Sequence, residues 1–251
     1  NASQLPQPNP RRADCVAAHW GNEGSMSIYH HADCMNPETG LPSFPDKHFD
    51  LAIVDPPYGI GHKLLSGEKR GSKFIRNVRH VDWDVLPNAD YWDQLFRISK
   101  NQIVWGGNYM SDNLPPSPCW VIWDKMQEFS GADFEMAWTS FNSPAKAFRM
   151  SRVEAHSNGK NHPTQKPSAL YRWLVKNYAK QGDKILDTHV GSASSLVVYE
   201  EMGFEYVGFE LDADYYRDSC KRLEAFRAQP KLFSGGEIFQ ASKLPEQGSL
   251  F

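Results

Sequence analysis

The chain of 251 residues lacks several features that would place it in well-defined classes of protein. It has no hydrophobic run near the roughly 18 residues that a membrane-spanning helix needs, and it does not open with the pattern of a secretory signal peptide. Its four cysteines are far apart and form no C-x-x-C pair, so their spacing gives no indication of a zinc or redox site. We therefore expect a soluble cytoplasmic protein with no membrane partner, no bound metal ion and reduced structural thiols.

Two further absences limit the fold. No internal repeat or low-complexity segment is present, and the dinucleotide-binding fingerprint G-x-G-x-x-G is missing. A chain with 40% hydrophobic and 13% aromatic residues can bury a substantial core, and it fits one large α/β domain that carries an insertion. Because the net charge is only −3, we do not expect the whole surface to bind nucleic acid, so any such contact must be local.

Residues 49–54 (FDLAIV) are an apolar run with the length and β-branched content of a buried parallel strand. Asp55-Pro56-Pro57-Tyr58 follows, at the carboxyl end of that strand, where ligands bind in open α/β sheets. The prolines stiffen the turn and leave its carbonyls as acceptors. Together with the carboxylate of Asp55 and the ring of Tyr58, they suit a planar ring that bears an exocyclic amino group. The alternative is an ordinary proline-rich turn in which the aspartate caps a helix.

Hydrophobic spacing predicts the other elements of the chain. We expect residues 1–24 to be a loose arm, residues 142–166 to be irregular, and residues 230–251 to be a loosely held tail, so that the folded domain spans 25–229. The tryptophans and phenylalanines of the later strands are expected to pack in the core. Strands are predicted at 26–30, 102–105, 119–123, 134–139, 184–187 and 205–209, and helices at 89–99 with Asn88 as cap, 167–179, 196–202 and 214–226.

A β-loop-α-β unit forms the second candidate site. The strand at 184–187 is followed by a turn rich in small residues (188–195), and the strand at 205–209 ends at Glu210. In such units the turn lets the backbone approach a ligand, while the acid bonds ribose hydroxyls. Asp33 stands after the strand at 26–30, where it fits either an acceptor for an adenine amino group or a turn-capping residue. Without the dinucleotide fingerprint, we expect a nucleoside site of another kind.

Two segments concentrate positive charge, and one of them is the long segment at 62–82, which has no hydrophobic periodicity and is predicted to be a loop over the site. Such clusters are often only solvated loops. Their placement, after the Asp55 turn and before the next motif, favours a rim that contacts phosphates. The cations are Lys63, Lys69, Arg70, Lys73, Arg76 and Arg79 in the first cluster, and Lys146, Arg149, Arg152 and Lys160 in the second.

Five stretches in this order, spanning about 190 residues, resemble the beta class of DNA amino-methyltransferases: ADCM (32–35), DPPYGIG (55–61), HPTQKP (162–167), DTHVGSAS (187–194) and GFELDADYY (208–216). The resemblance implies a Rossmann-like, circularly permuted methyltransferase fold, with a mostly parallel sheet and helices on both faces. It also implies an enzyme that moves a methyl group from S-adenosylmethionine to the exocyclic amino group of a flipped adenine in DNA. Relatives of this compact type occur in phages and in restriction-modification systems.

The resemblance also implies roles for individual residues. Catalysis falls to Asp55, Pro56, Pro57 and Tyr58, and target recognition to loops at about 62–82 and 142–161. With DNA as the substrate, the rim predicted from the charge clusters would bind it through Lys63, Lys69, Arg70, Lys73, Arg76, Arg79, Arg149 and Arg152. The family commonly has Phe-x-Gly-x-Gly in the turn after 187, but here His189 and Ala193 replace the phenylalanine and the second glycine; the methyl of Ala193 is tolerable if φ there is negative. The residues implied to bind the cofactor are Asp33, Cys34, Asp55, Thr164, Gln165, Lys166, Asp187, His189, Gly191, Ser192, Ser194 and Glu210.

Several alternatives remain open at this level. A cytosine amino-methyltransferase is disfavoured because those enzymes more often begin the turn with serine, and enzymes acting on RNA or protein glutamine usually begin it with asparagine. A catalytically silent DNA-binding relative would be compatible with the altered turn. A nucleotide-dependent oxidoreductase is disfavoured by the missing fingerprint. Both a monomer and a homodimer are compatible with the sequence.

Overall fold

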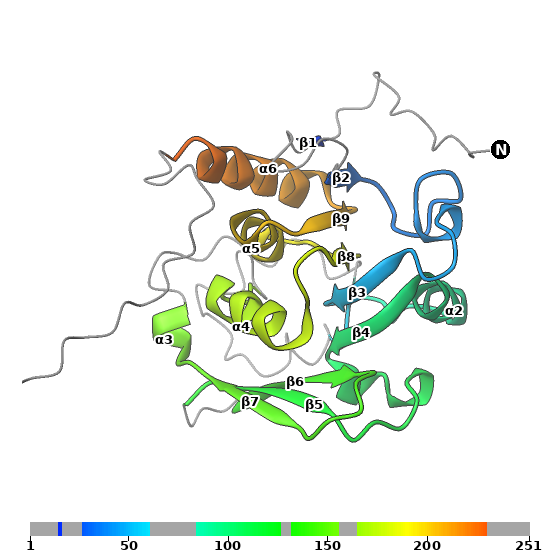
Figure 1. The fold of residues 1–251 in the computed structure, drawn as a ribbon, viewed down its shortest axis with the longest axis vertical. Coiled ribbons are helices and arrows are strands. Elements are labelled where there is room, and N and C mark those ends of the chain that lie inside the picture. The colour runs from blue at the N-terminus through cyan, green and yellow to red at the C-terminus, as the bar shows by residue number, and fades with distance from the viewer. Residues whose placement is uncertain (1–14, 17–26, 61–83, 127–131, 156–164, 230–251) are drawn as a thin grey trace, which may run out of the picture.

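The computed structural model describes residues 15–16, 27–60, 84–126, 132–155 and 165–229. Within these ranges one nine-stranded sheet has the order β1-β2-β9-β8-β3-β4-β6-β5-β7 (Figure 1). No helix among these residues is long and apolar enough to cross a membrane. The strands are β1 (Cys15–Val16), β2 (Ile28–His31), β3 (Phe49–Val54), β4 (Ser99–Trp105), β5 (Trp120–Asp124), β6 (Phe134–Thr139), β7 (Lys146–Arg149), β8 (Lys184–Asp187) and β9 (Glu205–Glu210).

Helices cover both faces of the sheet. In Figure 1, α4, α5 and α6 lie together on one side, and α2 lies on the other. The two hydrophobic clusters of the core match this division, because one contains the buried residues of α4 and α5 and the other those of α2. The helices are α2 (Ala89–Ile98), α3 (Arg152–Ala155), α4 (Ser168–Tyr178), α5 (Ser194–Met202) and α6 (Ala213–Arg227), with 3-10 turns η1 (Leu41–Ser43), η4 (Gly107–Tyr109) and η5 (Ser111–Asn113).

The central strands are parallel. β2, β9, β8, β3 and β4 are hydrogen-bonded in that order with the same direction, so their carboxyl ends meet at one edge of the sheet. Beyond β4 the sheet turns antiparallel at β6, and β5 and β7 complete it. The strand that carries the Asp55 turn precedes β8 and β9 in the chain but lies beside β8 in the sheet. The predicted mostly parallel sheet with helices on both faces is therefore confirmed.

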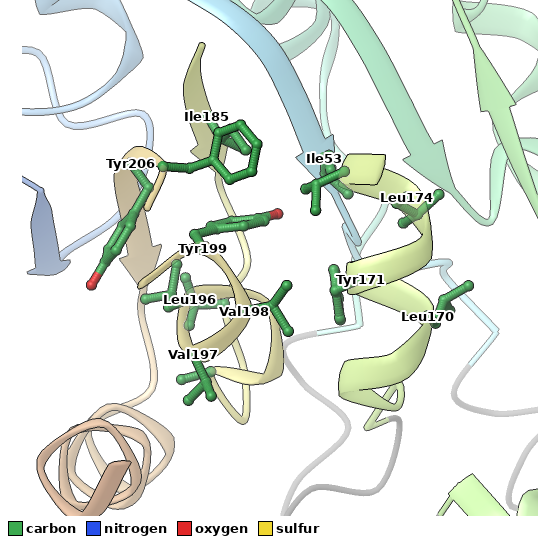
Figure 2. Packing of buried hydrophobic residues seen from close by; sticks show 14 of the residues in the cluster. Ile53, Leu170, Tyr171, Leu174, Ile185, Leu196, Val197, Val198, Tyr199 and Tyr206 are labelled. Carbon is green, nitrogen blue, oxygen red and sulfur yellow. The ribbon is translucent and has the colours of Figure 1, made fainter. Parts of the chain in front are cut away.

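The apolar run of β3 explains why this strand lies in the middle of the sheet. Leu51 and Ile53 face the cluster under α4 and α5, whereas Ala52 and Val54 face the cluster under α2. A strand buried on both faces needs such a continuous run, because successive side chains point to opposite sides. Figure 2 shows Tyr199 of α5 and the residues of α4 around Ile53.

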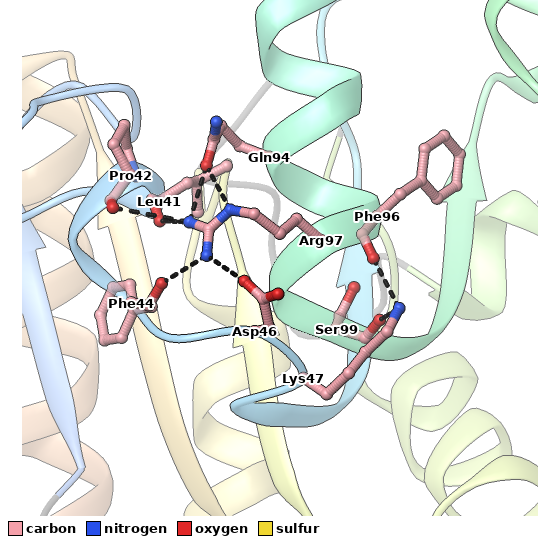
Figure 3. Close-up of polar contacts among 9 residues, drawn as sticks. All are labelled: Leu41, Pro42, Phe44, Asp46, Lys47, Gln94, Phe96, Arg97 and Ser99. Atoms are coloured by element: carbon pink, nitrogen blue, oxygen red, sulfur yellow. Dashed lines mark hydrogen bonds and ion pairs between the residues drawn. The ribbon is translucent and has the colours of Figure 1, made fainter.

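Arg97, in the last turn of α2, anchors the connection that leads from β2 into β3 (Figure 3). Its guanidinium donates to the carbonyl of Phe44 and to the carboxylate of Asp46, both at 2.8 Å. Lys47 donates to the carbonyl of Phe96 at 2.8 Å, close to the carboxyl end of the same helix, where a cation is favourable. The connection is thus fixed against α2 over the segment that follows Asp33.

The predicted elements are confirmed with ends displaced by three residues or fewer, and Asn88 caps α2 by accepting from the Tyr91 N–H. Two predictions are wrong. The segment 142–166 is not irregular throughout, because it contains β7 and α3, and the arm 1–24 contains β1, which pairs with β2. The hydrophobic spacing of the sequence does not predict β7, because β7 is a short edge strand with no buried side chain. The tail at 230–251 and the loop at 62–82 lie outside the described residues.

Candidate active site

The turn after β3 brings together three side chains. The Tyr58 hydroxyl donates to Asp55 Oδ1 at 2.6 Å, and the ammonium of Lys166 bonds to Asp55 Oδ2. The same ammonium lies 3.3 Å from the Tyr58 oxygen. Pro56 is buried beside them, and the Gly59 N–H donates to the Asp84 carboxylate at 2.9 Å. The four residues predicted to be catalytic therefore form a fixed turn in which both Asp55 oxygens already have partners.

Lys166 lies between two acidic side chains. Its side chain is 1% exposed, and its Nζ lies 3.4 Å from Glu135 Oε2 on β6. Lys125 Nζ contacts the other Glu135 oxygen at 3.0 Å, so two ammonium groups balance two carboxylates. Burial alone would lower the pKa of Lys166, but Asp55 and Glu135 outweigh it and raise that pKa. Burial would raise the pKa of Glu135, but Lys166 and Lys125 outweigh it and lower that pKa.

Sequence reasoning missed Glu135 and Lys125. Lys166 was predicted to bind the cofactor, but its ammonium points at the Asp55 turn. One signal for Glu135 was present, since β6 alternates and Glu135 shares a face with Ala137, which belongs to the core cluster under α4 and α5. An acid on the core-facing side of a strand requires a buried partner.

An aromatic pair covers the turn. The Tyr58 ring stacks on that of Tyr109, with centroids 5.4 Å apart and planes at 21°. Gly106, which follows β4 with φ of 69°, lets this ring approach the backbone, because a Cβ there would lie 2.2 Å from the Tyr58 ring. Tyr109 was not predicted, because its position after the Gly106-Gly107 pair carries no motif.

Asp187, at the carboxyl end of β8, organises the turn of residues 188–195. Its carboxylate accepts from the His189 N–H at 3.1 Å and from the Ser195 hydroxyl at 2.6 Å. Burial raises the pKa of Asp187 to about 7. Asp187, which the resemblance places among the cofactor-binding residues, therefore has both oxygens bonded to groups of the turn.

Glu210 and Arg222 hold the same turn from two other elements. The Glu210 carboxylate accepts from the Gly191 N–H at 2.8 Å, and burial raises its pKa. Arg222 of α6, which was not predicted, donates to the Ser192 carbonyl and the Ser194 hydroxyl, both at 2.9 Å. The predicted residues of this turn therefore do lie together, beside the end of β9.

The remaining predicted cofactor residues divide into three groups. Asp33 is exposed after β2, and its carboxylate accepts from the Met35 N–H at 2.8 Å, as a turn-capping residue does. Cys34 is buried in the cluster under α2, and burial raises the pKa of its thiol to about 12, so the thiol faces the core. Gln165 lies just before α4, and Thr164 is outside the described residues.

Few of the predicted DNA-binding cations fall in the described part of the chain. Arg149 is on the edge strand β7, where its exposed side chain lies 3.4 Å from Asp124, and Arg152 begins α3. Among the described residues no group of acids, histidines and cysteines could hold a metal ion. The cations of the two clusters that lie outside the described residues are Lys63, Lys69, Arg70, Lys73, Arg76, Arg79 and Lys160.

We call the turn of residues 188–195, together with Glu210 at the end of β9, the cradle. The sheet carries this cradle beside an acidic proline turn on the neighbouring strand β3. This is the α/β architecture of the Rossmann-like methyltransferase class. The chain belongs to the DNA methylase family, whose sequence profile matches residues 89–221. That match includes Glu135, Lys166 and the cradle, and it begins after the Asp55 turn. The predicted family is therefore confirmed.

Relatives support the same conclusion. The Type II methyltransferase M2.DpnII of Streptococcus pneumoniae is 30% identical over 169 residues, which are 67% of this chain and 56% of that protein. This chain thus spans about half the length of that relative. The DNA adenine methyltransferase YhdJ of Escherichia coli is 24% identical over an alignment that covers 94% of this chain and 97% of that protein.

Solved structures confirm the fold. The PvuII DNA methyltransferase, described as cytosine-N4-specific, superposes with a TM-score of 0.53 at 14% identity, covering 83% of this chain and 88% of that one. The M1.HpyAVI–SAM complex superposes with a TM-score of 0.50 at 16% identity, covering 78% of this chain and 98% of that one.

Ala193 has a left-handed backbone, with φ of 56° and ψ of 25°, in the turn that precedes α5. The condition for an unstrained alanine, a negative φ, is therefore not met. Such a conformation costs about 1–2 kcal/mol. The methyl group is fully buried in the cluster under α4 and α5, and this burial returns about 0.8 kcal/mol.

We expect Ala193→Gly to change the free energy of unfolding by less than about 1 kcal/mol, because relief of strain is offset by the lost methyl and by the greater entropy of the unfolded chain. Ala193→Val should lower it by about 2 kcal/mol or more, because a β-branched residue is strained at this φ and its side chain has no free space. Urea denaturation of both variants measures this. A valine variant as stable as the wild type would contradict the assigned backbone conformation.

His189 makes the free energy of unfolding depend on pH. Burial lowers its pKa to about 4, while its Nδ1 lies 2.9 Å from the Thr188 hydroxyl. The unfolded chain takes up a proton near pH 6.5 and the folded chain does not until about pH 4, so the folded state loses stability as the pH falls between these values. We expect this residue to account for about 1–2 kcal/mol of lost stability between about pH 7.5 and pH 5.

His189→Phe should remove that loss. The measurement is urea denaturation of the variant and the wild type at both pH values; other titrating groups, such as Asp187, are common to the two proteins. Equal losses in both would show that His189 titrates normally in the folded protein.

Proposed function

We propose that this protein transfers a methyl group from S-adenosylmethionine to the exocyclic amino group of adenine in DNA. The observation that carries the proposal is the position of the Asp55 carboxylate and the Pro56 carbonyl, at the end of the strand next to the cradle. Membership of the DNA methylase family supports the reaction class. The relative described as a DNA adenine methyltransferase, which aligns over nearly the whole chain, supports the substrate.

The residues at the carboxyl edge fit S-adenosylmethionine. Its adenine amino group and ribose hydroxyls are donors, and the acids Asp33 and Glu210 follow or end β2 and β9, so acceptors occur along the edge. We expect Asp33 to meet the adenine, Glu210 the ribose, and the backbone of Gly191 and Ser192 the methionine part. When bound, the cofactor supplies a methyl carbon whose bond to a positively charged sulfur breaks toward sulfur as the amino nitrogen attacks.

Asp55 and Pro56 act on the nucleophile. The lone pair of an aromatic amino nitrogen is delocalised into the ring. Hydrogen bonds from its two protons to the Asp55 carboxylate and the Pro56 carbonyl favour a pyramidal nitrogen with a directed lone pair. A carboxylate has about four acceptor positions, so Asp55 can accept this donor beside Tyr58. Orientation of this kind is worth several kcal/mol. The methylated nitrogen then releases one proton, for which Asp55 is the nearest acceptor, and no covalent protein intermediate forms.

Tyr58 offers the ring face on which an extruded base would stack. Unpairing a base costs a few kcal/mol, and stacking on an aromatic ring returns about 1–3 kcal/mol. Tyr109 stacks on one face of that ring, so a base that stacks on the same face must displace Tyr109. Adenine is favoured over cytosine because the turn begins with aspartate.

The strained Ala193 and the polar His189 favour a catalytically silent relative as the second candidate, and calorimetric titration with S-adenosylmethionine separates the two.

We expect Asp55→Ala to abolish methyl transfer while cofactor binding persists, because the variant loses the acceptor for the target amino group and keeps the cradle. Transfer of labelled methyl to DNA and calorimetric titration with S-adenosylmethionine are the two measurements. Asp50→Asn is the matched control, since it lies near the opposite end of the same strand, where Asp50 pairs with Lys100. Normal turnover by the Asp55 variant would reject the proposal.

The basic rim can be tested through salt. Arg70, Lys73 and Arg76, changed together to alanine, should weaken DNA binding and flatten its dependence on salt by about one unit of slope per lost phosphate contact. Lys100→Ala, an exposed cation at the opposite edge of the sheet, should leave the slope unchanged. A slope equal to that of the wild type in the triple variant would mean that the loop does not contact phosphates.

A further inference from the structure

We propose that Glu135 is a positioning residue for the methyl transfer, because it shares the buried Lys166 ammonium with Asp55 and so controls how Asp55 is presented to the target amino group. This inference rests on the proposed function. It assigns a role to a residue of β6 that touches neither the turn backbone nor the cradle.

The surroundings of the ammonium confine it. Lys166 Nζ bonds to Asp55 Oδ2 and lies 3.3 Å from the Tyr58 oxygen and 3.4 Å from Glu135 Oε2. The Trp105 ring covers another side, with its centroid 5.0 Å from Nζ. An ammonium has three donors, and three oxygens of the described residues are its partners. Since the side chain is 1% exposed, these groups take the place of water.

Glu135 is itself held in place. Lys125, whose side chain is 11% exposed, contacts its second oxygen at 3.0 Å. β6 is hydrogen-bonded to β4 on one side and to β5 on the other, so the backbone of Glu135 is fixed relative to the turn. A rigid carboxylate at 3.4 Å from Lys166 Nζ is therefore available as the ammonium's second anionic partner.

This arrangement matters when the target amino group arrives. The Tyr58 hydroxyl and the Lys166 ammonium already bond to Asp55, and a third donor bonds to the remaining acceptor positions more weakly the more of the carboxylate's charge the ammonium neutralises. A small shift of the ammonium toward Glu135 weakens its hold on Asp55 and leaves no buried charge without a partner. Without Glu135 the ammonium has a single anionic partner, and it must remain on Asp55.

The test uses four variants of the full chain. Glu135→Gln should lower kcat by roughly ten- to a hundredfold, the size expected of a misplaced reacting group, with little change in KM for either substrate. Glu135→Asp should restore a large part of kcat because it keeps the charge. In the Lys166→Met background, Glu135→Gln should cause no further loss, because the effect acts through Lys166. Activity is expressed per mole of protein that binds S-adenosylmethionine, so an unfolded fraction does not count.

Glu205→Gln is the control, because Glu205 forms an ion pair with Lys184 at 3.1 Å, at the opposite edge of the sheet, and should leave kcat unchanged. A Glu135→Gln variant with the kcat of an active wild type, or losses that multiply in the double variant, would overturn the inference and leave the proposed function standing. A wild-type protein that transfers no methyl to DNA would overturn the proposed function and this inference with it.

Discussion

The carboxyl ends of five parallel strands meet at one edge of the sheet, and every candidate site residue depends on that alignment. Asp33, Asp55 and Glu210 are far apart in the chain, yet they follow or end β2, β3 and β9. Parallel pairing brings these acids to one edge of the sheet. The edge is stable because both faces of β3 are buried. Loss of the helices from either face would therefore separate the site residues, even with every functional side chain unchanged.

This dependence explains what could be predicted from the sequence. The strand at 49–54 and the acids after each strand could be recognised because a run of apolar residues, and the polar residues that end it, are local features of the sequence. The direction of the Lys166 side chain was not, because it is set by Asp55 and Glu135, which approach it only in the folded chain. Likewise, the bonds from Asp187 to His189 and Ser195 could not be predicted from its position at a strand end, because they depend on the path of the turn. The edge strand β7 has no buried side chain, so nothing in its pattern distinguished it from a loop.

The turn after β8 shows how a departure from the family pattern can be tolerated. A left-handed alanine is unfavourable by itself, but the turn does not depend on local preference. Asp187 binds it from β8, Glu210 from β9 and Arg222 from α6. Three attachments from three elements over-determine the backbone, so the strain at Ala193 reduces stability without changing the path of the chain. We therefore expect the replaced glycine to affect the folding equilibrium more than the shape of the cradle.

The cradle and the Asp55 turn differ in what the side chains that hold them bond to. The cradle is held by the side chains of Asp187, Glu210 and Arg222, which bond to backbone N–H groups, a backbone carbonyl and hydroxyls whose positions are set once α5, α6 and β9 are packed. The Asp55 turn is held by side-chain charges, whose positions can shift when another donor enters. In the proposed reaction the cradle must hold one molecule in a single pose, whereas the turn must accept a base that arrives from outside. A rigid backbone cradle beside an adjustable cluster of charges meets both requirements, because the movement is confined to side chains and leaves the sheet edge unchanged.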